Sequence, residues 1–402
     1  MKLLIVTTEY GPGRSGGVAT TVRFLIGILR GRGHRVEIAS LQMSRSASES
    51  RRLLAPRTWF RGPVVVRTDE DDVVVYRVGA ALAELEVTRF LPRKPLDALM
   101  NAVDRVIVVG GTPAVGSVAA RSTVPVILQV ATLTVWERAA QVRTARGAVK
   151  AHRWLLRRLV SRLDSVGLRV AETVLVMNRR LQEWVERNSR AQRVVLAPPG
   201  VDTDKFVPGE RDESSPYLLY MGRMADPRKN ISGLLRAYAL YRQGHSAPKR
   251  LVLAGMTRPL AEDAATIDDL NLGHYVEVRS PLSESELIAL LQGASAFVSA
   301  SAEEGLGLAF IEALACGVPV VTTMTDGASM VVRDGVDGAV VKRGADEEIR
   351  LANALKEWED VGVDRRQVCR ARAVEVFSIQ AVSRRILDEI VRVPVSELTP
   401  PA

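Results

Sequence analysis

Cysteine is almost absent from this sequence of 402 residues, which contains only Cys316 and Cys369. Two cysteines cannot form a disulfide framework, and they lack the spacing of a structural zinc site. Histidine is also rare, with four residues in all. We therefore expect a protein of a reducing, cytoplasmic environment.

Long apolar runs are missing as well. No run approaches the roughly 20 residues that a helix needs to span a bilayer. The opening stretch, MKLLIVTTEYGPG, has an apolar core too short for a signal peptide and reaches Glu9 at once. These features again favour a cytoplasmic location.

The net charge of +9 comes from arginine, with 47 arginines against eight lysines. Basic residues gather in a predicted helix; they are Arg143, Arg146, Lys150, Arg153, Arg157, Arg158 and Arg162. A solvated helix face is the simpler interpretation, and a peripheral contact with anionic lipid at the inner membrane face stays open. No nucleic-acid-binding motif accompanies the charge, so we expect no nucleic-acid partner.

Strand and helix patterns alternate along the first half of the chain. KLLIVTT predicts a buried strand, residues 18–33 a helix with one apolar face, and RVEIASL the next strand. Further strands are predicted at 64–66, 73–77, 105–109, 125–130, 173–177 and 194–197. The pattern is typical of an open parallel sheet with helices on its faces.

The alternation starts again after residues 196–216, which are rich in proline, glycine and charge and resemble an interdomain connection. Five strands follow, in YLLYMG, LVLAG, YVEV, SAFVSA and VPVVTT. We therefore predict two Rossmann-like parallel-sheet domains that face each other across a cleft. Their expected bounds are 1–198 and 199–376, with 377–402 as a C-terminal helix that returns to the first domain.

The loop GPGRSGG contains three glycines, Gly11, Gly13 and Gly16, that satisfy G-x-G-x-x-G. Glu37 follows at the distance of a ribose-binding carboxylate, so dinucleotide binding is an alternative. However, Glu37 lies inside a predicted strand, and the loop is long for a tight phosphate turn. We prefer a reading in which Gly16 and Gly17 open a helix whose free N–H groups face an anion.

A second loop, in YMGRMADPRKN, places Arg223 and Lys229 between a strand and a helix. Fixed positive charge there would stabilise a diphosphate leaving group, because negative charge grows on it as its bond breaks. A solvated basic loop is the competing interpretation. We expect the neighbouring Arg228 and Arg236 to be surface charges.

A third segment, SAEEGLGLAFIEALACGVPVV, joins two apolar runs. Glu304 precedes a glycine-rich turn, a helix is predicted to begin near Leu308, and Glu312 lies one turn into it. Both carboxylates can face a ligand rich in hydroxyls, such as a sugar. Glu303 competes for the first position, and helix N-terminal charges favoured by the dipole are the alternative.

The E-x7-E pattern from Glu304 to Glu312 resembles the signature of retaining glycosyltransferases of family 4, which have the GT-B fold. The resemblance covers most of the chain. It includes SGGVATTVRFLIGILRGRGHRVEIAS, PPGVDTDKF, GRMADPRKN and VVRDGVDGAVV, in that order.

The resemblance implies a UDP- or GDP-linked sugar donor held mainly by the C-terminal domain, and an acceptor side in the N-terminal domain. It implies retention of configuration, no metal and no cofactor. The acceptor would be a hydroxyl of a small molecule, a secondary metabolite or an envelope glycoconjugate. The implied donor residues are Arg223 and Lys229 for the diphosphate, Glu304 with the backbone of Gly305, Leu306, Gly307 and Leu308 for the sugar, Glu312 for the ribose, and Gly16 and Gly17 for the phosphates.

Two positions depart from the family pattern. Ala131 stands where many members carry a histidine, and Met330 where members often have a glutamate. Thr132, Thr134 or Trp136 can line the acceptor site instead, although core packing of Trp136 is equally open. A catalytically silent sugar-nucleotide-binding protein and a GT-B epimerase are therefore alternatives. The donor base, the sugar, the acceptor and the oligomeric state stay undetermined.

Overall fold

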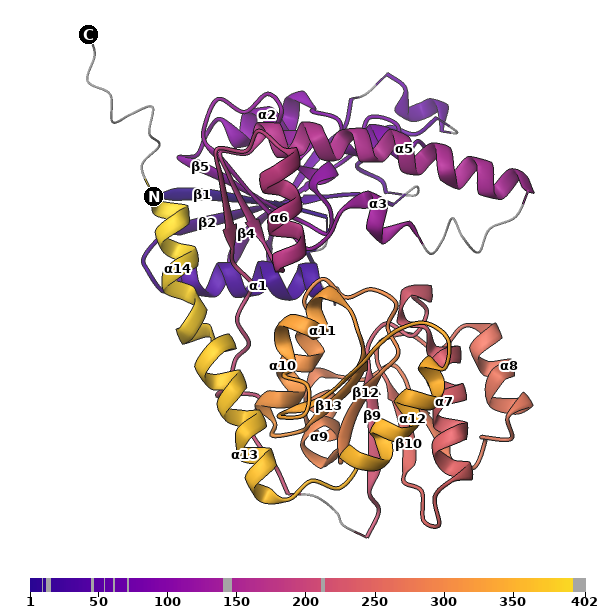
Figure 1. Cartoon of the computed structure of the whole chain (residues 1–402). Helices are drawn as coiled ribbons and strands as arrows, with labels where there is room; N and C mark the ends of the chain where they lie inside the picture. Colours follow the sequence, from indigo (N-terminus) through magenta and orange to yellow (C-terminus); the bar gives the residue numbers. More distant parts are fainter. Residues whose placement is uncertain are drawn as a thin grey trace. The chain divides into compact units, whose positions relative to one another are not determined.

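The computed structural model describes residues 1–8, 10–11, 16–44, 47–53, 55–60, 62–70, 72–139, 147–210 and 214–392. The chain divides into two compact units (Figure 1). One unit comprises Met1–Pro199 together with Ser383–Ala402, and the other comprises Gly200–Val382.

The first unit contains an eight-stranded sheet with the order β3-β4-β2-β1-β5-β6-β7-β8. Its strands are β1 Lys2–Thr7, β2 Arg35–Leu41, β3 Val65–Glu70, β4 Val73–Val78, β5 Arg105–Gly110, β6 Val126–Val130, β7 Thr173–Val176 and β8 Arg193–Leu196. Its helices include α1 Gly17–Arg30, α2 Lys94–Met100, α3 Thr134–Glu137, α5 Gly147–Val170 and α6 Arg179–Asn188, with short helices η1 Pro56–Thr58, η2 Val87–Phe90 and η3 Pro113–Ala119. The central strands β1 and β5 are buried almost throughout, as expected for a parallel sheet covered on both faces.

One edge of this sheet departs from the predicted parallel arrangement. Strand β3 pairs with β4 in the antiparallel direction, from Val65 opposite Val78 to Glu70 opposite Val73. Only two residues connect the strands, and a parallel crossover needs about a dozen. The short connection therefore imposes a hairpin, while β4 pairs with β2 in parallel.

The second unit contains a six-stranded parallel sheet with the order β11-β10-β9-β12-β13-β14. Its strands are β9 Tyr217–Met221, β10 Arg250–Ala254, β11 Val276–Arg279, β12 Ala296–Ser299, β13 Val320–Thr323 and β14 Gly338–Val341. Its helices include η4 Pro227–Lys229, α7 Ile231–Gln243, α8 Ala261–Asp269, α9 Glu284–Gly293, α10 Leu308–Ala315, α11 Asp326–Val331, α12 Glu347–Trp358, α13 Val363–Arg372 and the π-helical η5 Ala373–Phe377. The strand order reverses between β9 and β12, and such switch points are where open α/β sheets bind ligands.

The chain enters and leaves the second unit at neighbouring positions. The Val201 amide donates a hydrogen bond to the Phe377 carbonyl at 2.8 Å, and the Ile379 amide donates to the Val201 carbonyl at 3.1 Å. A Cβ atom on Gly200 would lie 2.8 Å from the Ile379 Cα atom, so glycine permits this close approach. Helix α14, Ile379–Val391, begins here.

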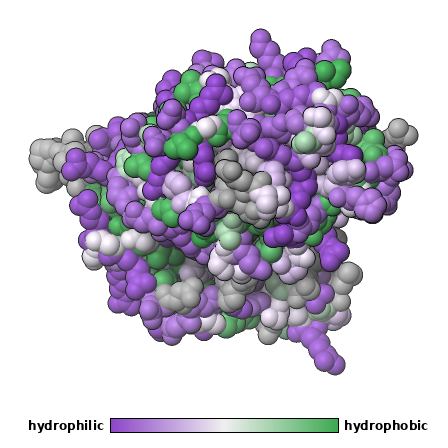
Figure 2. Space-filling model, turned by 90° about the horizontal axis from the view of Figure 1, so that it is seen from below, coloured by the Kyte–Doolittle hydropathy of each residue, from purple (hydrophilic) through white to green (hydrophobic). Residues whose placement is uncertain are grey.

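The end of α14 is bound to the first unit. Glu389 on this helix accepts two hydrogen bonds from the Arg193 guanidinium at the start of β8, one of them 2.7 Å long from Nη2. Among the described helices, none has both the length and the apolar character needed to cross a membrane. On the face of the molecule shown in Figure 2, hydrophobic side chains are scattered among hydrophilic ones.

Candidate active site

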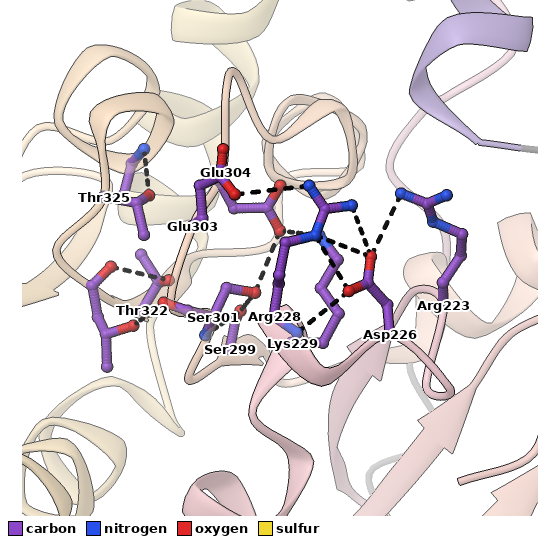
Figure 3. A network of polar contacts seen from close by, with 12 residues as sticks. Arg223, Asp226, Arg228, Lys229, Ser299, Ser301, Glu303, Glu304, Thr322 and Thr325 are labelled. Carbon is purple, nitrogen blue, oxygen red and sulfur yellow. Dashed lines mark hydrogen bonds and ion pairs between the residues drawn. The ribbon is translucent and has the colours of Figure 1, made fainter. Parts of the chain in front are cut away.

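Two loops of the second unit meet where its strand order reverses. Strands β9 and β12 are neighbours, and the loops that follow their carboxyl ends are joined by hydrogen bonds to backbone carbonyls. The Ala302 amide donates to the Arg228 carbonyl at 2.6 Å, and the Asn230 side chain donates to the Ala300 carbonyl at 3.2 Å. Segments about 75 residues apart in the sequence therefore form one polar network (Figure 3).

Lys229 and Glu304 lie together in this network. The Lys229 ammonium forms an ion pair with Glu304 Oε1, and the two side chains are only 14% and 17% exposed. The Ser301 hydroxyl donates to the same carboxylate oxygen at 3.1 Å. The cation expected to meet a phosphate and the carboxylate expected to meet a sugar thus neutralise each other in the structure.

Arg223 and Arg228 flank Asp226 in the loop after β9. The Arg223 side chain is 45% exposed, and its Nη2 atom lies 3.4 Å from Asp226 Oδ2. Arg228 was expected at the surface, and this prediction is wrong: its side chain is 17% exposed and contacts both Asp226 and Glu303. Arg236 is 47% exposed and pairs with Glu348, in agreement with its expected surface position.

The electrostatics of Asp226 follow from these contacts. Burial by itself raises the pKa of Asp226, but hydrogen bonds and positive charge from Arg228 outweigh burial and hold this pKa below its usual range. Asp226 therefore stays ionised and also caps η4, since its side chain accepts a hydrogen bond from the Arg228 amide. The cap fixes the loop that carries Lys229.

The glycine-rich turn after Glu304 leads directly into α10. Gly307 has a φ angle of 81°, and a Cβ atom there would lie 2.4 Å from the Phe310 ring. A glycine is therefore required at this position. The turn is also fixed from outside, because the Gly327 amide at the start of α11 donates to the Glu304 carbonyl at 2.9 Å. Leu306 is 3% exposed and packs in the interior, so it can offer a ligand only its backbone, as Gly305 and Gly307 do, whereas Leu308 at the start of α10 is half-buried.

Glu312 lies one turn further along α10, among other charges. Burial and the nearby Glu284 carboxylate raise the pKa of Glu312 to about 7, and the positive charge of Lys205 opposes this rise. Lys205 and Glu284 form their own ion pair, with 2.5 Å between Nζ and Oε2. Glu312 is thus a carboxyl group that changes its protonation near neutral pH.

Gly16 and Gly17 belong to the first unit and open α1. Gly16 is the N-cap residue with a φ angle of 122°, and its carbonyl accepts a hydrogen bond from the Thr20 amide. A Cβ atom on Gly17 would meet no heavy atom of the described chain within 4 Å. Packing within this part of the chain therefore does not explain glycine at position 17.

The position of Glu37 in the structure argues against dinucleotide binding, for which this residue would supply the ribose-binding carboxylate. Glu37 is 4% exposed and pairs with Lys2 at 3.3 Å and with Arg35 at 3.1 Å. Both partners stand at the first residues of their strands, so these contacts form at the amino ends of β1 and β2. Ligands of such sheets bind at the opposite, carboxyl ends. Gly13 lies outside the described residues.

The acceptor candidates follow strand β6. Thr132 is 7% exposed, and its amide donates to the Gly111 carbonyl at 3.0 Å, as the Ala131 amide does at 3.2 Å. Trp136 packs against α6, with its ring centroid 6.3 Å from that of Trp184 and 4.3 Å from the Arg180 guanidinium. These contacts with Trp184 and Arg180 support the interpretation that Trp136 is a packing residue.

A buried carboxylate that the sequence analysis did not single out organises this region. Asp164 on α5 accepts hydrogen bonds from the Ala114 amide at 2.9 Å, the Thr134 hydroxyl at 2.8 Å and the Thr134 amide at 3.0 Å. Burial raises the pKa of Asp164 to about 6, against the effect of these hydrogen bonds. Asp164 thus joins the segments that follow β5 and β6.

The basic helix of the sequence is α5, and its first half is exposed. Val149, Trp154 and Leu155 are 54%, 44% and 50% exposed beside Lys150 and Arg153. Arg143 and Arg146 lie outside the described residues. Among the residues described, no group of three or more His, Cys, Asp or Glu side chains is arranged to hold a metal ion.

Comparison with known proteins identifies the second unit. Residues 201–375 match the family model of glycosyl transferases group 1. The match covers less than half of the chain. A curated relative, D-inositol 3-phosphate glycosyltransferase 1 of Catenulispora acidiphila, is 35% identical over 168 residues, which cover 38% of this chain and 40% of the relative. The chain thus matches about two fifths of that relative's length.

Solved structures resemble this chain over nearly its full length. Sucrose-phosphate synthase from Thermosynechococcus elongatus has a TM-score of 0.72 at 20% identity, covering 97% of this chain and 98% of its own. Anabaena HepE in complex with UDP-glucose has a TM-score of 0.68 at 16% identity, covering 97% and 99%. At these identities the likeness shows the fold, and the predicted GT-B fold with two parallel-sheet α/β domains is confirmed.

Proposed function

We propose that the protein is a retaining glycosyltransferase of family 4 that moves a hexosyl group from a UDP- or GDP-linked sugar to an acceptor hydroxyl without a metal ion. The observation that carries this proposal is the network at the switch point of a group 1 glycosyltransferase domain, where Arg223, Lys229 and Glu304 lie together. The acceptor would be a small molecule, a secondary metabolite or an envelope glycoconjugate.

The proposed donor site uses cations where the leaving group develops charge. The half-exposed Arg223 and the Lys229 ammonium would bind the diphosphate, whose negative charge grows as its bond to the sugar breaks. Gly16 and Gly17 would add N–H groups from the start of α1. The UDP-glucose bound to Anabaena HepE supports a donor of this class.

Glu304 and Glu312 would hold the sugar and the ribose. We assign Glu304 to positioning and electrostatic stabilisation of the donor sugar, with the backbone from Gly305 to Leu308 beside it. In this scheme the acceptor oxygen bonds to the anomeric carbon on the face from which the phosphate oxygen departs. The departing phosphate takes the proton of the acceptor hydroxyl, so retention needs neither a protein nucleophile nor a separate base.

A thermal-shift screen tests the proposal. UDP or GDP should raise the unfolding temperature, whereas ADP, TDP and NAD should raise it less, because a ligand stabilises only the state that binds it. Nucleotide sugars of the preferred base would then be tested for donor hydrolysis and for transfer. The proposal is wrong if no nucleoside diphosphate stabilises the protein.

Ala131 favours a second candidate, a catalytically silent sugar-nucleotide-binding protein. Such a protein would be stabilised by the nucleotide sugar but would neither hydrolyse nor transfer it. A GT-B epimerase, the less favoured alternative, would convert the donor sugar without any acceptor. Analysis of the remaining nucleotide sugar and of any released or transferred sugar, after incubation with the donor with and without acceptors, distinguishes the three candidates.

We also propose that the protein is cytoplasmic and that the exposed half of α5 lies against an anionic membrane face. Trp154 and Leu155 are exposed beside Lys150 and Arg153, and such a combination favours an anionic lipid surface. Flotation with vesicles of phosphatidylglycerol and phosphatidylcholine should recover the protein, and vesicles of phosphatidylcholine alone should not. Equal recovery of a Lys150→Glu/Arg153→Glu variant would contradict this part.

A further inference from the structure

We infer that Arg228 is a positioning residue for the donor sugar, because its bridge to Glu303 sets the place of Glu304 beside Lys229. The inference rests on the proposed function, since it concerns how the same site holds a nucleotide sugar. Arg228 itself is not expected to touch the ligand.

The Arg228 guanidinium connects two loops through a fixed fork. Its Nη2 atom lies 2.7 Å from Asp226 Oδ2, its Nε atom lies 3.0 Å from Asp226 Oδ1, and its Nη1 atom lies 3.5 Å from Glu303 Oε2. A planar guanidinium donates in fixed directions, so one carboxylate orients the group toward the other. The ionised Asp226 thus aims Arg228 at the loop after β12 (Figure 3).

The backbone strengthens the same connection. The Arg228 carbonyl accepts the Ala302 amide at 2.6 Å, next to the Glu303 side chain that its guanidinium contacts. Both the main chain and the side chain of Arg228 therefore hold the loop that begins after Ser299. Arg228 and Glu303 are each 17% to 19% exposed, so water screens this bridge less than a surface pair.

The two ion pairs between the loops are formed by consecutive residues of each loop. Arg228 pairs with Glu303, and the next residues along each loop, Lys229 and Glu304, pair with each other. A shift in the first pair would therefore move the second. Misplacement of a reacting group by about 1 Å can lower a rate about 100-fold, so a bridge that holds Glu304 in place has a large effect without contacting the substrate.

The test compares Arg228→Gln, Glu303→Gln and the double variant with Arg236→Gln, a matched change of an exposed arginine paired across α7 and α12. Calorimetry would measure the affinity for the preferred nucleotide sugar and for its nucleoside diphosphate. We expect each single variant to bind the nucleotide sugar about tenfold more weakly, which corresponds to about 1.4 kcal/mol. The diphosphate, which lacks the sugar, should change less than about threefold, by under about 0.7 kcal/mol.

The coupling between the Arg228 and Glu303 substitutions distinguishes a positioning role from a general loss of structure. If the bridge acts as one unit, the double variant binds no more weakly than the single variants. Arg228→Lys keeps the positive charge, but lysine cannot bridge the Asp226 and Glu303 carboxylates. This variant should therefore also lose affinity for the nucleotide sugar and not for the diphosphate. The inference is wrong if Arg228→Gln binds the nucleotide sugar as tightly as the wild type, or if it loses equal affinity for the nucleotide sugar and the diphosphate. It is also wrong if the effects of the two single substitutions multiply in the double variant. Failure of the wild-type protein to bind any nucleoside diphosphate would instead refute the proposed function.

Discussion

Replacing Glu304 by glutamine removes one charge from the network without changing the shape of the side chain. In the structure the Glu304 carboxylate pairs with Lys229 and accepts a hydrogen bond from Ser301. Under the proposed function, a diphosphate must therefore compete with Glu304 for the ammonium. We predict that Glu304→Gln binds the nucleoside diphosphate more tightly than the wild type while it loses most of its turnover.

The magnitude follows from the partial burial of the pair. Two unit charges 4 Å apart attract by about 4 kcal/mol at an effective dielectric constant of about 20. The cost of burying both charges offsets much of this attraction, which leaves a net interaction of about 1 to 2 kcal/mol. Release of Lys229 should therefore strengthen diphosphate binding by about tenfold. Loss of one preorganised electrostatic group typically lowers kcat by about 100- to 1,000-fold.

Calorimetric titration with UDP and GDP, together with the transfer rate at saturating donor, measures both effects. Glu348→Gln serves as the control because Glu348 belongs to an exposed pair of the same unit. Its diphosphate affinity and turnover should match the wild type. Unchanged or weaker diphosphate binding by Glu304→Gln would refute the competition argument, and near-normal turnover would refute the assigned role of Glu304.

Three further predictions concern other residues. Gly17→Ala should fold as stably as the wild type, because its Cβ atom would meet no heavy atom of the described residues within 4 Å, but it should weaken donor binding. Gly27→Ala on α1, whose Cβ atom likewise meets none of the described residues, should keep donor binding, as calorimetry would show. Under the proposed function, ribose hydroxyls would donate to the charged form of Glu312, whose pKa is about 7. Diphosphate affinity should then rise from pH 6 to pH 8, and Glu312→Gln should remove that part of the rise. The pKa of Asp164 is raised from 3.8 to about 6, so the folded state retains a proton that the unfolded chain releases. The free energy of unfolding should then fall by about 2 kcal/mol from pH 4 to pH 6 in the wild type relative to Asp164→Asn, in urea titrations.

The fold was largely predictable because buried parallel strands form continuous apolar runs. Strands β9, β12 and β13 fall within the runs identified in the sequence. Strand β14 was missed, since GAVV is short and begins with a glycine that the neighbouring strand requires: a Cβ atom on Gly338 would lie 2.0 Å from the Val320 carbonyl oxygen. That requirement comes from a partner strand and leaves no local pattern.

The candidate site was predictable to the extent that strand ends determine it. The loops that contain Lys229 and Glu304 follow neighbouring strands. The sequence pattern of strand followed by loop therefore predicts that both residues lie at the carboxyl edge of the sheet. The partners of Arg228 were not predictable in the same way, because several charges of each sign share these loops. Asp164 was missed because no local pattern separates it from a surface charge on a helix with many arginines, and only the fold shows that it accepts three hydrogen bonds.

The pairing of Lys229 with Glu304 has a consequence for donor selection under the proposed function. A nucleotide sugar supplies a new partner to each member of the pair, since its phosphate takes the ammonium and its sugar hydroxyls take the carboxylate. A bare diphosphate supplies only the first, and leaves a partly buried carboxylate without its cation, which costs free energy. The intact pair therefore favours the donor over the spent nucleotide. It follows that Glu304→Gln should improve diphosphate binding more than nucleotide-sugar binding. The ratio of the two dissociation constants measures this difference directly, because any change common to both ligands cancels in the ratio.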